Sequence, residues 1–311
     1  MNHNILVSVI IPNYNHARYL NERIQSVLNQ TYQNFEMIIL DDKSTDNSRE
    51  VIEKYRACSK VSHILYNETN SGSTFKQWEK GIKLAKGEFI WIAESDDYCE
   101  PSLLEALVKQ VQSHPTCALV YALSQMVDLQ GRFFGKRTRP YGNVFLAGKR
   151  FIQRYMCCEN PVYNASSAIF RREAALEIPP LYMEYKGAGD RLFWIEIAEK
   201  GDVAIVNRPL NYFRQHPNKV TPQKTLDGTN LMEDKRTFDY LSEKGFLKNP
   251  FRRFLCKGYY LYLIKSTRLS DETVRHRVLM QWNAGRAGTS VQRFLGRMLV
   301  SLRYHNIHLY L

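Results

Sequence analysis

Carboxylates gather directly behind a short apolar segment near residue 90. Glu94, Asp96 and Asp97 follow the run at residues 89–93, which has the length and composition of a buried strand. Carboxylates at the C-terminal end of such a strand face the crevice in which open α/β sheets bind ligands. Like charges this close repel each other, and a divalent cation with a preference for oxygen ligands, Mg²⁺ or Mn²⁺, would relieve that repulsion and bridge to substrate phosphates. The alternative is an acidic loop that caps the helix beginning near Pro101.

A second acidic pair, Asp41 and Asp42, ends the predicted strand at residues 35–40. A carboxylate at Asp42 can accept a hydrogen bond from an imide N–H or a ribose hydroxyl, and a uridine nucleotide carries both groups. Helix capping is the alternative role, although Asp46 could supply that cap instead.

Four further side chains could take part in catalysis or in ligand binding. Asp190 opens a predicted helix after two glycines, an exposed place for a general base, although an ordinary N-cap is the commoner role on spacing alone. His216 could bind a metal or a phosphate, but a lone histidine beside proline is more often a loop residue. Lys76 and Arg214 could meet phosphates, or they could lie on a solvated face.

The elements that must position these residues alternate along the first part of the chain. Strands are predicted at residues 5–11, 35–40, 63–66 and 89–93, with a helix between each pair. This alternation predicts βαβ units and a parallel sheet, which places both acidic clusters at one sheet edge. Later strands are predicted at residues 118–121, 166–170, 203–206 and 210–213, with a hairpin or extended loop at 131–148. From about residue 221 the pattern becomes helical and basic.

Composition narrows the class of protein. The chain has 311 residues, 44% of them hydrophobic, and a net charge of +12, which favours anionic partners. Six cysteines without metal-finger spacing indicate a reduced, cytoplasmic compartment. We expect no signal peptide, because the apolar run at residues 5–11 is too short and lacks a cleavage site, and no spanning helix, because no apolar stretch is long enough.

The order of the motifs resembles the family 2 nucleotide-sugar glycosyltransferases over about residues 5 to 220. The motifs, in order, are PNYN, LDDKSTD, NSG, GEFIWIAESDD, GDRLFW and YFRQH. The resemblance implies an α/β fold of the GT-A type, a Rossmann-like, mostly parallel sheet flanked by helices. We therefore predict a glycosyltransferase domain at residues 1–222 and a basic helical C-terminal extension at residues 223–311.

The same resemblance implies roles for individual residues. Pro12, Tyr14 and Asp42 would hold the base and ribose, with Asp41 nearby. The segment 94–97 is similar to the family's D-x-D element. The nucleotide-binding set is completed by Lys76, Glu94 and Asp97.

The remaining roles concern the metal and the proton. Asp96 would be the metal-binding member of the D-x-D element, and His216 matches a second metal or diphosphate contact. Asp190 matches the catalytic base. Glu94 departs from the family pattern, since its side chain is one methylene longer than that of aspartate.

We interpret the chain as an inverting glycosyltransferase of the hexosyltransferase type. It would move one sugar from a nucleotide-diphosphate donor, UDP-linked by preference, to a hydroxyl of a glycan or lipid-linked acceptor in surface polysaccharide synthesis. Transfer of a single sugar is expected because the Q-x-x-R-W element of processive polymerases is not found. A nucleotidyltransferase is one alternative, but the turn at residues 12–15 lacks the glycines of a phosphate loop. A non-catalytic polyanion- or membrane-binding module is the other, although acidic clusters oppose phosphate, and we expect no nucleic-acid partner.

The C-terminal region carries an apolar stripe at helical spacing: Val291, Phe294, Leu295, Met298, Leu299 and Leu302. Basic residues fall off this stripe, and further basic residues interrupt the apolar segment at 251–264. Such a helix suits binding in the plane of an anionic membrane, here the inner face of the cytoplasmic membrane. The alternative is that the stripe packs on the catalytic domain or on a second subunit of a homodimer.

Overall fold

The computed structural model describes residues 4–134, 144–217, 219–282 and 289–304. The chain divides into two compact units. The first comprises Met1–Gly148, Val162–Met183 and Glu196–His216, and the second comprises Lys149–Pro161, Glu184–Ile195 and Pro217–Leu311. The domain boundary at residue 222 stays a prediction.

The first unit begins with the predicted alternation of strands and helices. The strands are β1 (Val7–Asn13), β2 (Phe35–Asp41), β3 (Val61–Tyr66) and β4 (Phe89–Ile92), and the helices between them are α1 (Ala17–Leu28), α2 (Ser48–Glu53) and α3 (Thr74–Leu84). β1 pairs in parallel with both β2 and β4, and β2 with β3. The predicted α/β class and parallel βαβ sheet are confirmed, and the C-terminal ends of β2 and β4 lie on either side of the end of β1.

The second half of the sheet is mixed. It contains β5 (Tyr98–Cys99), β6 (Cys117–Val127), β7 (Val144–Leu146), β8 (Ala168–Arg171) and β9 (Asp202–Arg214), with the helices α4 (Leu103–Ser113) and α6 (Arg172–Leu176). The strand order is β3-β2-β1-β4-β8-β6-β9-β5, and β7 pairs with β9. β8 runs antiparallel to both neighbours, whereas β6 and β9 are parallel.

Three details differ from the sequence prediction. The strands expected at 203–206 and 210–213 are one strand, β9, whose pairing with β6 shifts register near Pro209. The two-residue strand β5 was not predicted. In the segment expected to form a hairpin or extended loop at 131–148, β7 occupies the end, and residues 135–143 lie outside the described residues.

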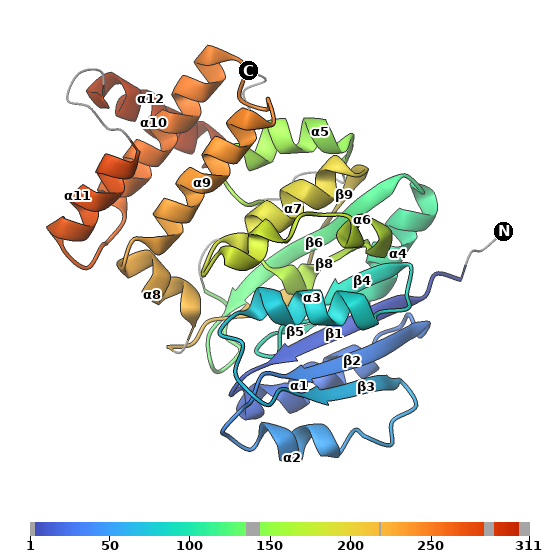
Figure 1. The fold of residues 1–311 in the computed structure, drawn as a ribbon. Coiled ribbons are helices and arrows are strands. Elements are labelled where there is room, and N and C mark those ends of the chain that lie inside the picture. The colour runs from blue at the N-terminus through green and yellow to red at the C-terminus, as the bar shows by residue number, and fades with distance from the viewer. Residues whose placement is uncertain (1–3, 135–143, 218, 283–288, 305–311) are drawn as a thin grey trace. The chain divides into compact units, whose positions relative to one another are not determined.

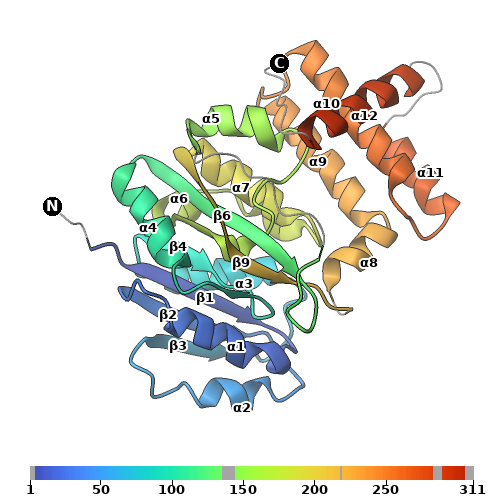
Figure 2. The ribbon, with the colours of Figure 1, turned by 180° about the vertical axis from the view of Figure 1, so that it is seen from behind.

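Helices cover both faces of the sheet. Figures 1 and 2 show α3 on one face and α1 and α4 on the other. Alternate residues of β1, namely Val7, Val9 and Ile11, belong to the core cluster under α1 and α4. Ile10 points the opposite way and meets α3 at Gly81, where an added Cβ would lie 2.5 Å from the Ile10 side chain. Glycine therefore lets α3 lie close against the sheet.

The second unit is helical. It contains most of α5 (Gly148–Phe151), a π-helical turn (Ile152–Met156), the first half of α7 (Gly189–Glu199), α8 (Val220–Leu226), α9 (Thr229–Glu243), α10 (Pro250–Ser266), α11 (Glu272–Gln281) and α12 (Thr289–Tyr304). It has a core of its own, in which Tyr260 stacks on Trp282 at 4.5 Å between ring centroids and Phe238 packs against the same indole. Among the described helices, none has the length and apolar character that crossing a bilayer requires.

Candidate active site

The acidic segment after β4 is held by hydrogen bonds to its two outer carboxylates. Trp78 of α3 donates to the Glu94 carboxylate at 2.8 Å. Asp97 is 1% exposed and accepts from Asn164 and Ser166, both at 2.8 Å, and from the backbone N–H of Arg214 at 3.1 Å. Protein donors thus reach both oxygens of Asp97, and its predicted role in nucleotide binding stays a prediction.

Asp96, between them, faces a different environment. Its carboxylate oxygen lies 3.0 Å from Nε2 of His216. A second imidazole, that of His16, lies edge-on to His216 with 5.5 Å between the ring centroids, and its Nδ1 is 2.8 Å from the Ser95 hydroxyl. Potential ligand atoms of His16, Asp96 and His216 all lie within 4.8 Å of one another. The structure thus brings together the two residues predicted to bind metal, 120 positions apart in sequence.

His16 was not singled out from the sequence. It follows the PNYN motif by one position, in the turn between β1 and α1. Its place beside the end of β4 follows from the parallel pairing of β1 with β4. The position of His16 directly after the PNYN motif is therefore the sequence feature that could have identified it as a site residue.

Arg214 proves to be a buried positioning residue. Its Nε donates to the backbone carbonyl of Asp96 at 3.0 Å, and its guanidinium lies between the rings of Tyr19 and Tyr98, 5.1 and 5.0 Å from their centroids. It also pairs with Glu22. These contacts fix the backbone of Asp96, so Arg214 does not lie on the solvated face that was one of its two alternatives.

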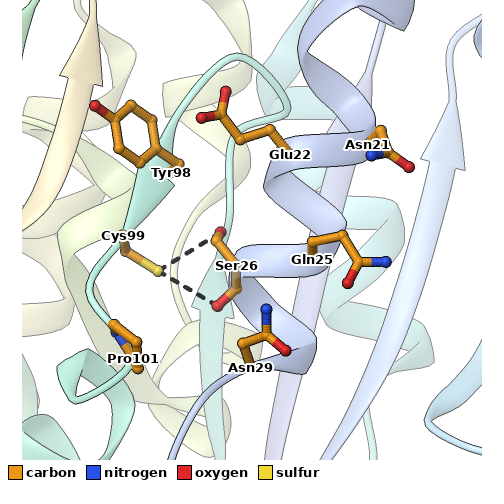
Figure 3. A pocket seen from close by; sticks show the side chains of 8 residues that line it. All are labelled: Asn21, Glu22, Gln25, Ser26, Asn29, Tyr98, Cys99 and Pro101. Carbon is orange, nitrogen blue, oxygen red and sulfur yellow. Dashed lines mark hydrogen bonds between the residues drawn. The ribbon is translucent and has the colours of Figure 1, made fainter. Parts of the chain in front are cut away.

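A groove adjoins this arginine on the side of α1 (Figure 3). Its lining residues are Asn21, Glu22, Gln25, Ser26, Asn29, Tyr98, Cys99 and Pro101. None of the residues predicted to bind nucleotide or metal lines it, so we assign it no role in the reaction.

The predicted nucleotide residues gather at the ends of β1 and β2. Asp41 accepts from the Asn13 side chain at 2.8 Å and from the Ser44 hydroxyl at 2.6 Å. Asp42 accepts from the side chains of Asn67 and Gln77, at 2.6 and 2.9 Å. The two carboxylates are thus buried and fixed by neutral donors, a polar setting that a base or ribose could share.

Three more predicted residues border this pair. Pro12 is buried within β1 in register with Leu40 of β2. Tyr14 is 46% exposed just beyond the strand, which leaves its ring available for stacking. Lys76 on α3 is exposed, and its ammonium donates to the Ser71 carbonyl at 3.2 Å.

Asp190 lies in the second unit, in the first turn of α7. Its carboxylate is half-buried and accepts from the Asn160 side chain at 2.8 Å and from the backbone N–H of Arg191 at 2.8 Å. Burial raises the pKa of Asp190 to about 6, against the lowering effect of Arg191. A carboxylate with a pKa near neutrality is a better proton acceptor than an ordinary aspartate and is still ionised at pH 7.

The loop before Asp190 is fastened by α9. The Glu233 carboxylate accepts from the backbone N–H groups of Lys186, Gly187 and Ala188, at 2.6, 3.0 and 2.8 Å. Arg191 follows Asp190 and pairs through its buried guanidinium with Asp234 at 2.6 Å. Helix α9 therefore holds the loop and the helix start on both sides of Asp190.

Comparison with known proteins decides the family. The profile described as glycosyl transferase family 2 matches residues 8–178, more than half of the chain. The chain belongs to glycosyl transferase family 2. It is therefore an enzyme, and the alternatives of a nucleotidyltransferase and of a non-catalytic module are not supported.

Individual relatives agree with this membership. The chain is 36% identical over 165 residues to glycosyltransferase GlyG of Streptococcus pneumoniae, a match that covers 53% of this chain and 54% of GlyG. It is 33% identical over 196 residues to poly(ribitol-phosphate) beta-N-acetylglucosaminyltransferase TarS of Staphylococcus aureus, covering 60% of this chain and 31% of TarS. The chain thus matches about half the length of GlyG and less of TarS.

Solved structures show the same fold. The structure of TarS residues 1–349 in complex with UDP-GlcNAc is similar with a TM-score of 0.59 at 19% identity, covering 99% of this chain and 93% of that one. The mannosyltransferase PcManGT from Pyrobaculum calidifontis, in complex with GDP-Man and Mn²⁺, gives a TM-score of 0.59 at 17% identity, with coverages of 98% and 83%. These likenesses confirm the GT-A fold.

Replacing Glu233 should test how far α9 controls the loop before Asp190. Glu233→Gln offers one oxygen acceptor in place of two and loses the charge, and hydrogen bonds to a charged group are worth about 1.5–3 kcal/mol. We expect a lower melting temperature and a reduced kcat for sugar transfer, with unchanged nucleotide affinity measured by calorimetry. Glu243→Gln, an exposed change in the same helix, is the control. Equal activity in the two variants would show that Glu233 does not position the loop.

Proposed function

We propose that this enzyme is an inverting, metal-assisted glycosyltransferase that moves one sugar from a nucleotide-diphosphate donor to an acceptor hydroxyl. The observation that carries the proposal is the pairing of Asp96 with His216 at the end of β4, beside a second imidazole. We take residues 1–222 as the glycosyltransferase domain and residues 223–311 as its helical extension.

The donor atoms around Asp96 suit a divalent cation. Two ligands at right angles around a cation, each at about 2.1 Å, lie about 3.0 Å apart, which is the separation of the Asp96 oxygen and His216 Nε2. Asp96 and His216 would hold the ion, with His16 as a third ligand after a small side-chain adjustment. Two imidazoles with one carboxylate favour Mn²⁺ over Mg²⁺, because Mg²⁺ prefers oxygen ligands.

When bound, such a cation acts as a Lewis acid for the departing diphosphate. The protein's own residues supply the remaining steps. Asp42 and Asp41 would accept from the base and ribose, Tyr14 would lie against the base, and Lys76 would offset phosphate charge. Asp190 would take the proton from the acceptor hydroxyl as that oxygen attacks the anomeric carbon, with the diphosphate leaving.

A UDP-sugar is our preferred donor. TarS, which the chain resembles in both sequence and fold, is known in complex with UDP-GlcNAc, and its name assigns it a poly(ribitol-phosphate) acceptor. We therefore propose a glycan or lipid-linked hydroxyl of a surface polysaccharide as the acceptor. The six cysteines are free thiols in the structure. Because free thiols are typical of reducing compartments, we propose a cytoplasmic location.

Removing the metal should weaken donor binding. In calorimetry, UDP should bind in the presence of Mn²⁺, and EDTA should weaken that binding. Asp96→Ala should weaken it to a similar degree, because the ion loses its charged ligand. Asp239→Ala, a change of a surface aspartate on α9 whose side chain is 47% exposed, serves as the control. Equal binding of UDP and GDP without metal would remove Asp96 from the proposal.

Removing the basicity of Asp190 should slow transfer without affecting the nucleotide. Asp190→Asn keeps the shape of the side chain, and transfer should fall by roughly 10²–10⁴-fold, the usual contribution of a general base. UDP affinity should stay close to that of the wild type. Asp271→Asn changes an aspartate that caps α11 and is the matched control for a capping role. If transfer activity falls only slightly, and by the same factor, in both variants, Asp190 is a helix cap.

The pH dependence follows from the raised pKa of Asp190. A general base must be ionised, so kcat/KM should fall as the pH drops through about 6. Asn160→Ala removes a hydrogen bond that stabilises the ionised carboxylate, so the pKa should rise and the acidic limb should move to higher pH. If the acidic limb of the pH profile came from the metal ligands and not from Asp190, Asn160→Ala would leave its position unchanged.

A further inference from the structure

Helices α10 and α12 approach each other at two glycines. A Cβ added to Gly258 would lie 2.2 Å from the backbone oxygen of Gln292, and one added to Gly296 would lie 2.1 Å from the backbone oxygen of Gly258. The Gln292 side chain also donates to the carbonyl of Phe254 at 3.2 Å. The two backbones therefore touch at glycines, and the buried face of α12 consists of Gln292, Gly296 and Leu299.

This packing divides the apolar stripe that the sequence predicts. Leu299 is buried and Leu295 is half-buried, so packing within the protein accounts for these two. The rest of the described stripe is exposed, as is the apolar start of α10. We call these exposed side chains the α10–α12 face: Phe251 (55% exposed), Phe254 (38%), Val291 (63%), Phe294 (62%) and Met298 (45%).

The same two helices carry only positive charge. Neither contains aspartate or glutamate, and their basic residues are Arg252, Arg253, Lys257, Lys265, Arg293, Arg297 and Arg303. Within the described part of the chain, Arg252, Arg253 and Arg297 form no ion pair with an acidic side chain. Burial, with the nearby charges of Lys235 and Arg253, lowers the pKa of Lys257. These three arginines are therefore available to an anionic partner.

We propose that the α10–α12 face binds in the plane of an anionic lipid membrane. Its aromatic and aliphatic side chains would enter the boundary between head groups and acyl chains, and the flanking arginines would meet the anionic head groups. A second copy of the chain is a poorer partner, because two such faces would bring like charges together. Nucleic acid would satisfy the arginines but leave the exposed phenylalanines and Met298 without an apolar environment.

Vesicle flotation of the full chain tests this proposal. Without donor or acceptor present, the protein should float with vesicles of phosphatidylcholine and phosphatidylglycerol, and much less with phosphatidylcholine alone. High salt should release it, because the attraction between arginines and head groups is screened. Since no sugar transfer is measured, the result is independent of the proposed catalytic function.

Substitutions separate the apolar and electrostatic contributions. Phe294→Glu should reduce the partition coefficient between vesicles and water roughly ten- to a hundredfold, because the variant lacks the phenylalanine ring that would be buried in the membrane. The pair Arg293→Gln and Arg297→Gln should reduce it roughly 30-fold, about fivefold for each charge. Phe133→Glu, a change of an equally exposed aromatic residue in the first unit, should float like the wild type. Circular dichroism and the melting temperature should confirm that every variant is folded.

Three results would overturn the proposal. The wild type could stay at the bottom of the gradient at low salt, or Phe294→Glu and Phe133→Glu could float equally. Light scattering without vesicles could also show a dimer that Phe294→Glu converts to a monomer. That last result would assign the face to a subunit interface.

Discussion

The buried carboxylate of Asp97 is the constraint on which the donor side of this enzyme depends. A carboxyl group that is almost completely buried must find hydrogen-bond partners, and Asp97 finds donors in Asn164, Ser166 and the backbone of Arg214. These three donors lie just before β8 and at the end of β9, so the requirement ties the loop after β4 to two distant strands. His216 follows β9 by two residues and is thereby delivered to Asp96. Asp97 thus helps to build the site, and its neighbour Asp96 is the residue that we propose as a metal ligand.

The acceptor side depends on a different set of interactions within the second unit. Asp190 directly follows a loop whose N–H groups are bound by Glu233, and the next residue, Arg191, is buried and paired with Asp234. Two adjacent residues of α9 therefore control the start of α7. The helical region after residue 217 is not merely an appendage, because it fixes the position and the environment of the proposed base. The burial of Asp190 also raises the pKa of its carboxyl group towards neutrality.

The C-terminal helices form a core of their own and also expose apolar side chains. Tyr260 and Trp282 belong to a core within the second unit. Because α10 and α12 approach each other at glycines, larger apolar side chains such as Phe294 and Met298 remain exposed. A helix pair that packs through its backbones can be stable and still present an apolar face. This separation explains how one amphipathic sequence can support both packing and a surface for a partner.

The sequence by itself determined the parallel half of the sheet, the family and the identity of most candidate residues. Apolar runs followed by turns are local features, and the order of the motifs is read directly along the chain. Only the tertiary structure decided what Asp97, Arg214 and His16 do, because their surroundings come from strands and turns far apart in sequence. The same holds for β5, a strand of two residues with no periodicity to detect, and for the apolar stripe of α12. Helical spacing shows that a stripe exists, but the close approach of two glycines decides which of its side chains are buried.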